Sequence, residues 1–197
     1  MWEDRYATPN YVFGTEPAAF LVKHRAYLTP GRTALSVADG EGRNSVYMAG
    51  QGMAVTALEL VERAIEKARA LAAARGVTVD FRQADLLDHD WGAETYDLVA
   101  GVFFQFVGPA ERARLFAGMA AAVAPGGLIL LHGYRPEQIA YGTGGPPFAE
   151  NMYTETVLRD AFPGWEVLVA ESYDIEIAEG AAHVGMSALI DFIARKP

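Results

Sequence analysis

The chain has 197 residues, of which 51% are hydrophobic and 21% are charged, a balance that favours a folded domain and excludes long disorder. It has no cysteine, which excludes disulfides and thiolate chemistry. The formal net charge of −9 disfavours nucleic-acid substrates, since no block of Lys and Arg offsets it. No signal peptide and no apolar run of membrane-spanning length is visible, so we expect a cytoplasmic protein without a membrane partner.

Strand-like and helix-like segments alternate along the chain. We expect helices at 15–28, 44–51, 62–75, 109–123 and 153–162, and strands at 33–38, 53–59, 77–82, 96–102, 128–134, 165–177 and 183–195. Gly76 is expected to cap the helix before it, and His24 to lie on the surface of the first helix. This alternation is typical of an α/β fold with a mostly parallel sheet.

A turn with two glycines, residues 38–45, follows the first predicted strand and leads into a helix. Gly40 and Gly42 permit positive φ and let a ligand approach the backbone closely. Glu59 ends the next strand, 19 residues after Gly40, where a carboxylate can accept hydrogen bonds from both hydroxyls of a ribose. Each feature alone also fits a plain turn or an exposed acid, but together they predict a site for a nucleoside-containing ligand.

The identity of that ligand depends on the residues after the second glycine. The dinucleotide motif G-x-G-x-x-G requires glycine or alanine where this chain has Ser45. Arg43 and Asn44 also crowd the turn against which a pyrophosphate would pack. The motif therefore favours a smaller, non-phosphorylated ligand over NAD.

The sequence resembles the class I S-adenosylmethionine-dependent methyltransferases, and more narrowly a small bacterial group related to the tellurite-resistance methyltransferases. That group shares the G-x-G-R-N-S turn seen at residues 40–45. A closer subgroup resembles the chain nearly from end to end, through the segments at 1–5, 11–17, 133–138, 141, 143–146, 179–180 and 183.

The resemblance implies a Rossmann-like, doubly wound sheet of seven strands, mostly parallel with the last strand antiparallel. It implies a single domain over 1–197, with an N-terminal lid and helix at 1–30, a cofactor-binding core at 33–134 and a substrate loop at 135–151. The cofactor would be S-adenosyl-L-methionine. The residues implied to bind it are Ala38, Asp39, Gly40, Gly42, Asn44, Glu59, Leu60, Ala84, Asp85, Leu86, Gly101 and Phe103.

The chain departs from the family pattern at three positions. Ser36 stands where the family has an acid, and Ala38 stands where it has its first glycine. Gln105 stands where relatives often carry histidine, so a proton-transfer role there is not expected. Because the first two departures lie in the predicted cofactor site, a protein without catalytic activity stays open as an alternative.

Substrate contacts are predicted from the N-terminus and from the loop after the fifth strand. The set is Tyr6, Tyr11, Phe13, Tyr134, Arg135 and Tyr141, and simple loop packing is the alternative for each. No residue is predicted to be catalytic. If the acceptor requires a general base, Tyr6, Glu137 and His132 are the candidates, although core packing is the simpler interpretation of His132. No group of residues has metal-ligand spacing.

We therefore expect methyl transfer from S-adenosylmethionine to a small-molecule acceptor by in-line displacement. Two alternatives stay open at this point. One is a non-catalytic protein that binds S-adenosylmethionine or a partner, and the other, less favoured, is a nucleotide-dependent oxidoreductase. The sequence leaves the acceptor and the oligomeric state open.

Overall fold

The computed structural model describes residues 2–180 and 183–197. Contacts within the chain gather into two compact units. The first contains the described residues up to His89 together with Glu179 and Gly180, and the second contains Asp90–Ala178 and His183–Pro197. Each unit has its own strands and its own helices.

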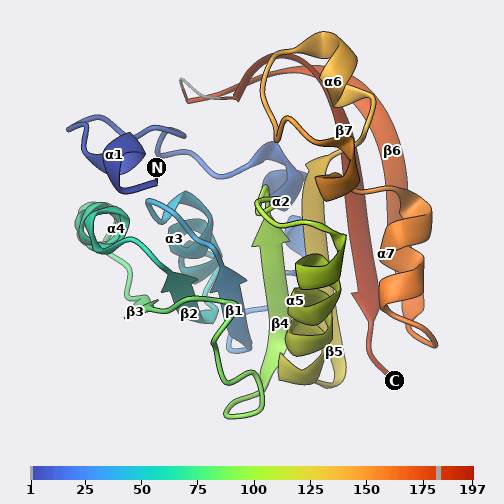
Figure 1. The fold of residues 1–197 in the computed structure, drawn as a ribbon. Helices are drawn as coiled ribbons and strands as arrows, with labels where there is room; N and C mark the ends of the chain where they lie inside the picture. Colours follow the sequence, from blue (N-terminus) through green and yellow to red (C-terminus); the bar gives the residue numbers. More distant parts are fainter. Residues whose placement is uncertain (1, 181–182) are drawn as a thin grey trace. The chain divides into compact units, whose positions relative to one another are not determined.

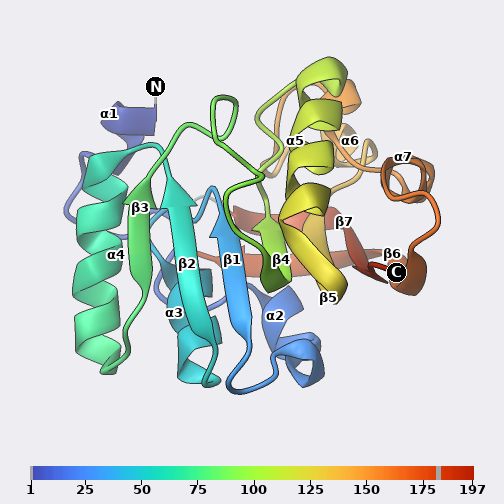
Figure 2. The same cartoon turned by 90° about the horizontal axis from the view of Figure 1, so that it is seen from below.

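The first unit is built on three parallel strands. Its elements are α1 (Trp2–Tyr6), α2 (Ala19–Lys23), the 3-10 turn η1 (Arg25–Tyr27), β1 (Thr33–Val37), α3 (Arg43–Gly50), β2 (Ala54–Glu59), α4 (Glu62–Arg75) and β3 (Asp80–Gln83). Strand β2 pairs in parallel with β1 and with β3, and Figure 2 shows the three side by side. Helices α3 and α4 contact each other and β2. Because the strands are parallel, the segments that follow β1 and β2 leave the sheet at the same edge.

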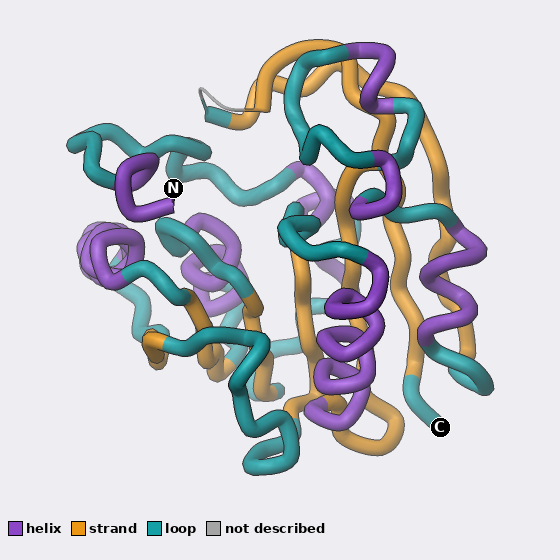
Figure 3. Tube along the Cα trace, in the orientation of Figure 1, coloured by secondary structure: helices purple, strands orange, loops and turns teal. Residues whose placement is uncertain are grey.

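The second unit combines parallel and antiparallel pairing. Its elements are β4 (Tyr96–Val102), α5 (Pro109–Ala122), β5 (Val123–Tyr134), α6 (Gln138–Tyr141), η2 (Ala149–Asn151), α7 (Glu155–Ala161), β6 (Glu166–Glu179) and β7 (His183–Arg195). Strand β5 pairs in parallel with β4 and antiparallel with β7. Helix α5 packs on β4 and β5, as Figures 1 and 3 show. No helix in the described residues is both long and apolar enough to span a membrane.

Three sequence predictions match the structure at both ends of their elements, and one of them is strand β7, which runs over His183–Arg195 as expected. Helix α4 runs over Glu62–Arg75 as expected, because its Ala-rich sequence favours the helix and Gly76 ends it in the left-handed conformation, at a φ of 67°. Strand β4 runs over Tyr96–Val102 as expected, since a short apolar run is typical of a buried parallel strand.

The prediction of a long first helix at 15–28 is wrong. Only Ala19–Lys23 is α-helical, followed by one 3-10 turn. The reason lies outside the segment, because the N–H of Ala18 donates to Asn44 Oδ1 and Ala18 itself is extended, with a ψ of 137°. The surface position predicted for His24 is also wrong, since its ring is buried against Phe20 and Tyr27.

Other boundaries move for local reasons. Strand β3 begins at Asp80 rather than Val77, because the N–H of Val77 donates to Ala72 and belongs to the end of α4. Strand β5 begins directly after α5, at Val123 rather than Leu128. The predicted loop at 135–151 contains α6 and η2, and the short helix α1 was not predicted.

The start of α3 lies unusually close to the middle of α4. Gly42 precedes α3 with a φ of +88°, and a Cβ placed on it would lie 2.6 Å from the Cβ of Ala68 and 2.8 Å from its Cα. Glycine at 42 and alanine at 68 therefore allow the two helices to approach, and the approach fixes where the turn before α3 lies.

Gly42→Ala is expected to destabilise the fold by more than about 2 kcal/mol, because positive φ costs an alanine about 1 kcal/mol and the clash with α4 adds to that cost. Gly76→Ala is the matched control, since Gly76 also has positive φ, of +67°, but no atom lies within 4 Å of a Cβ there. Urea unfolding of both variants measures the difference. Equal losses would show that α4 gives way and that the close approach has no energetic weight.

Candidate cofactor site

The turn after β1 is tied to the end of β2 by one carboxylate. Glu59 Oε2 accepts a hydrogen bond from the N–H of Gly40 at 2.8 Å, and Oε1 accepts one from the N–H of Val61 at 3.0 Å. Glu59 is buried and its backbone oxygen also accepts from the N–H of Ala84 after β3. Each carboxylate oxygen keeps lone-pair capacity for a further donor, so the residue can hold the turn and still accept from a diol.

A second buried carboxylate lies inside the same turn. Asp39 accepts hydrogen bonds from the hydroxyl of Ser36 at 2.7 Å, from the hydroxyl of Ser45 and from the N–H of Ser45. Burial raises the pKa of Asp39 to about 6, although its hydrogen bonds with the two serines act in the opposite direction. Ser36 stands where the resembling family has an acid. Its hydroxyl instead donates a hydrogen bond to a different acid, Asp39, three residues further on.

Ala38 holds a conformation that glycine adopts more easily. Its φ is +48°, which places an alanine in the left-handed region. The family's usual glycine at this position thus has a physical reason, and the chain keeps the conformation without it.

The residues predicted on the adenine side lie beyond Glu59. The side chain of Leu60 is 53% exposed, and its backbone oxygen accepts from Gln83 Nε2 at 2.9 Å. Asp85 is exposed, with Oδ1 accepting from the N–H of Leu87 at 2.9 Å, while Leu86 is buried. An exposed apolar side chain beside a carboxylate-held turn suits the face of a purine ring.

Two residues of the G-x-G-R-N-S turn bind other parts of the chain. Arg43 forms a buried ion pair with Glu179 at 2.8 Å, and Glu179 also accepts from the N–H of Ala19. Asn44 Oδ1 accepts from the N–H of Ala18. Asn44 was predicted to bind the cofactor, and in the structure its side-chain oxygen anchors the start of α2.

Tyr6, Tyr11 and Phe13, which were predicted to contact the substrate, pack within the first unit. The ring of Tyr6 is buried with Val61 and Ala64, and its hydroxyl oxygen would lie 3.0 Å from a Cβ on Gly40. Burial raises the pKa of Tyr6, and the negative charges of Glu59 and Glu41 raise it further. Tyr6 therefore lies directly over the glycine turn as a neutral donor and acceptor.

Gly101 and Phe103 belong to the second unit. Phe103 has a φ of +55°, uncommon for a bulky side chain, and its N–H donates to the backbone oxygen of His132 at 2.9 Å. Its ring packs on His132, Tyr134 and His183, with centroid distances of 4.7, 5.0 and 4.4 Å. A strained residue held by a ring cluster is a feature that functional sites often show.

Gln105 has a positioning role within the second unit. Its Nε2 donates to the backbone oxygen of Tyr134 at 2.8 Å, and its Oε1 accepts from the N–H of the same residue at 2.6 Å. The side chain thus pairs with the end of β5 as a neighbouring strand would, which glutamine can do because it carries both a donor and an acceptor.

The predicted substrate residues of the second unit take different positions. Tyr134 is buried among Met152, Leu189 and other apolar residues. Arg135 forms an ion pair with Asp174, and the hydroxyl of Tyr141 donates to the other oxygen of that carboxylate at 2.8 Å. Asp174 therefore fastens Arg135 and Tyr141 to β6.

Sequence reasoning missed a polar network across three strands. Asp191 on β7 faces His132 on β5, with Oδ1 lying 2.8 Å from His132 Nδ1, and it also accepts from the hydroxyl of Tyr173 on β6 at 2.8 Å. The burial predicted for His132 is confirmed. An aspartate inside an otherwise apolar strand was the only sequence signal for this network.

Comparison with known proteins bears on both units. Residues 34–127 match a family model described as a methyltransferase domain. No curated protein matches the chain. Among solved structures, the chain is similar to the protein solved for the conversion of a disulfide bond into a thioacetal group during echinomycin biosynthesis, with 22% identity over 95% of this chain and 84% of that one and a TM-score of 0.76.

Two further structures are similar over the whole chain. TehB from Haemophilus influenzae is 18% identical, with 100% of this chain and 66% of that chain covered and a TM-score of 0.73. The N-methyltransferase NodS from Bradyrhizobium japonicum WM9, solved with S-adenosyl-l-homocysteine, is 16% identical, with 100% and 96% covered and a TM-score of 0.72. These similarities confirm the predicted fold class, a Rossmann-like sheet of seven strands in the described residues, mostly parallel with β7 antiparallel to β5.

Asp39→Asn should change how stability depends on pH. The folded-state pKa of about 6 lies above the ordinary value of 3.8, so the folded state binds more protons and this group lowers the free energy of unfolding as pH rises from about 4 to 6. Asparagine does not titrate, so the variant does not lose this stability as pH rises. The free energy of unfolding of the variant relative to the parent should therefore increase by up to about 3 kcal/mol between pH 4 and 6. Urea unfolding from pH 4.5 to 7 measures it, and a constant difference would contradict the buried, protonatable carboxyl.

Ala38→Gly should stabilise the fold by about 0.5–1 kcal/mol, because release of left-handed strain exceeds the added entropy of the unfolded chain. Ala49→Gly, in the second half of α3, is the control and should destabilise by about 1 kcal/mol. Chemical unfolding of both variants separates the two signs, and a loss in both would mean that Ala38 is not strained.

Proposed function

We propose that the chain is a class I S-adenosylmethionine-dependent methyltransferase and that it transfers the methyl group to a small-molecule acceptor by in-line displacement. The observation that carries the proposal is the bridge made by Glu59 between the glycine turn and the end of β2. A carboxylate fixed there by two backbone amides is pre-oriented toward a ribose at the edge of the sheet.

The residues of the first unit fit this cofactor. The glycine turn leaves Gly40 without a side chain between the backbone and Tyr6, and Leu60 exposes an apolar side chain beside Glu59. Asp39 and Glu59 give the turn a negative character, which complements the positive charges of the ammonium and sulfonium groups. Ser36 on β1 donates a hydrogen bond to Asp39 in the turn, and Ala38 keeps the left-handed conformation, so the turn is intact, which favours a binding site over a degenerate one.

When bound, S-adenosylmethionine supplies a methyl group already activated by its sulfonium. The chain itself orients the cofactor and excludes water while the acceptor approaches in line. Glu59 orients the ribose, Leu60 packs on the adenine and Tyr6 covers the glycine turn. No residue is assigned as a general base, since a soft or anionic acceptor needs none.

The proposed acceptor class rests on charge and on one structural neighbour. A net charge of −9 opposes binding of a polyanionic nucleic acid. The neighbour solved for echinomycin biosynthesis is described by the conversion of a disulfide bond into a thioacetal group. Both favour a small molecule over a polymer as the acceptor.

Calorimetric titration with S-adenosylmethionine, S-adenosylhomocysteine and NADH tests the cofactor. We expect the first two to bind and Glu59→Gln to weaken both by about 1.5–3 kcal/mol, the usual contribution of hydrogen bonds to a charged group. Glu62→Gln is the matched control, because Glu62 carries the same charge at the exposed start of α4 and forms an ion pair with Arg69 on the same helix.

Binding of NADH alone would overturn the proposal in favour of an oxidoreductase. Cofactor binding with no methyl transfer to any member of a broad acceptor panel would favour the non-catalytic alternative. Unchanged affinity in a folded Glu59→Gln variant would remove Glu59 from the site.

A further inference from the structure

The middle residue of the glycine turn, Glu41, binds the N-terminal segment of the chain. Glu41 is 3% exposed, and its Oε2 accepts hydrogen bonds from the N–H of Val12 at 2.7 Å and from the N–H of Phe13 at 3.4 Å. The turn that begins the cofactor site is therefore bonded to the backbone of the N-terminal segment, about 30 residues earlier in the chain.

Lys67 on α4 completes this connection. Its Nζ lies 2.7 Å from Glu41 Oε1 and also donates to the backbone oxygen of Asn10 at 2.9 Å. The hydroxyl of Tyr11 donates to the backbone oxygen of Lys67 at 3.0 Å, and the ammonium lies 5.8 Å from the centre of the Tyr11 ring. We call Glu41 and Lys67 the latch, and residues 2–13 the strap that it holds.

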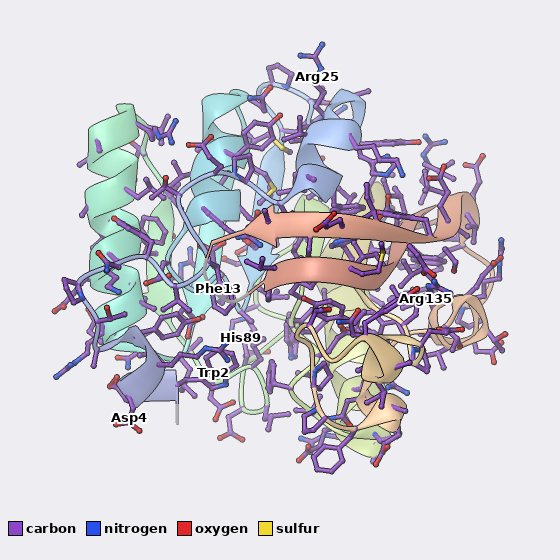
Figure 4. All side chains as sticks on the ribbon, turned by 90° about the horizontal axis from the view of Figure 1, so that it is seen from above. Trp2, Asp4, Phe13, Arg25, His89 and Arg135 are labelled. Carbon is purple, nitrogen blue, oxygen red and sulfur yellow. The ribbon has the colours of Figure 1, made fainter. Side chains whose placement is uncertain are left out.

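The held strap carries a cluster of aromatic side chains. The rings of Trp2 and Tyr6 stack with centroids 5.8 Å apart, and Phe13 packs on both at 6.5 Å. The guanidinium of Arg5 lies 5.0 Å from the Trp2 ring and 5.2 Å from the Phe13 ring. Figure 4 shows Trp2 and Phe13 close together. This cluster joins α1 to the part of the strap that Glu41 binds.

The cluster also sets the position of Tyr6. Tyr6 packs on Val61 and Ala64 at the start of α4 and places its hydroxyl over Gly40. Phe13 connects Tyr6 to the backbone amides that Glu41 holds. Release of the latch would therefore remove the hydrogen bonds and the ion pair that hold the strap to the glycine turn.

We propose that Glu41 and Lys67 are positioning residues that hold the N-terminal strap, and with it Tyr6, closed over the cofactor bound at the glycine turn. The inference rests on the proposed function, since it assigns a role at that same site. The middle residue of the G-x-G motif, Glu41, then has a specific role, because its carboxylate binds Lys67 and two backbone amides of the strap. The strap must open for the cofactor to enter or leave, so the latch controls how long the cofactor stays bound.

The test measures the dissociation rate of S-adenosylhomocysteine by stopped flow. Glu41→Gln and Lys67→Met are each expected to raise the rate by about tenfold, since each leaves a buried charge without its partner. The double variant should show less than the product of the two effects, because both residues act in one contact. Lys67→Arg keeps a charged donor at this position, so its dissociation rate for S-adenosylhomocysteine should stay close to that of the parent.

The control pair is Glu62 and Arg69, an ion pair at 2.8 Å on the exposed face of the same helix. Glu62→Gln and Arg69→Met make the same charge changes on α4 and should leave the dissociation rate unchanged. Trypsin cleavage after Arg5 gives a second measurement, because it reports strap opening directly. Bound S-adenosylhomocysteine should protect this bond in the parent and in the control variants, and protect it much less in the latch variants.

The outcomes separate this inference from the proposed function. If the parent fails to bind S-adenosylhomocysteine, the proposed function fails. If the parent binds it and the folded latch variants show the same dissociation rate and the same protection of Arg5, the latch has no positioning role. Tyr6→Phe distinguishes the hydroxyl from the ring, since a faster dissociation in that variant assigns the contact to the hydroxyl over Gly40.

Discussion

The hydrogen bond from the N–H of Gly40 to Glu59 is the interaction on which the proposed cofactor site depends. It joins the turn after β1 to the end of β2, at the edge where parallel strands leave room for a ligand. The second oxygen of Glu59 holds Val61 at the entry to α4, and α4 in turn supports α3, Tyr6 and the strap. One carboxylate thus orders the turn, the helix beside it and the segment that covers both.

Three buried acids lie in or next to this turn, and each has a different kind of partner. Hydroxyl groups surround Asp39, backbone amides bind Glu59, and an ammonium with two amides binds Glu41. Burying a carboxylate is costly unless hydrogen bonds replace its hydration, so the three sets of partners are what permit this density of negative charge. Asp39 relies mainly on hydroxyls for that support, and burial raises its pKa to about 6 in spite of them.

The sequence was sufficient for features that depend on local chemistry. Helix α4, its end at Gly76 and strand β4 follow from propensity and period, and the glycine turn with Glu59 was found from spacing alone. It was insufficient where a distant residue decides the conformation. The start of α2 is set by the bond from Ala18 to Asn44, and the roles of Ser36 and Gln105 depend on partners that no local pattern reveals. The predicted ligand contacts of Asn44, Gly101 and the other site residues stay predictions.

The close approach of Gly42 to Ala68 shows a second reason for the small side chains of α4. The alanines of this helix were interpreted as helix formers, yet Ala64 and Ala68 are fully buried, beneath Tyr6 and beside Gly42. A larger side chain at 68 would push α3 and its turn away, however well it favoured the helix. A substitution at residue 42 or at residue 68 is therefore limited by the residue at the other position, and the two identities should covary among relatives of this chain.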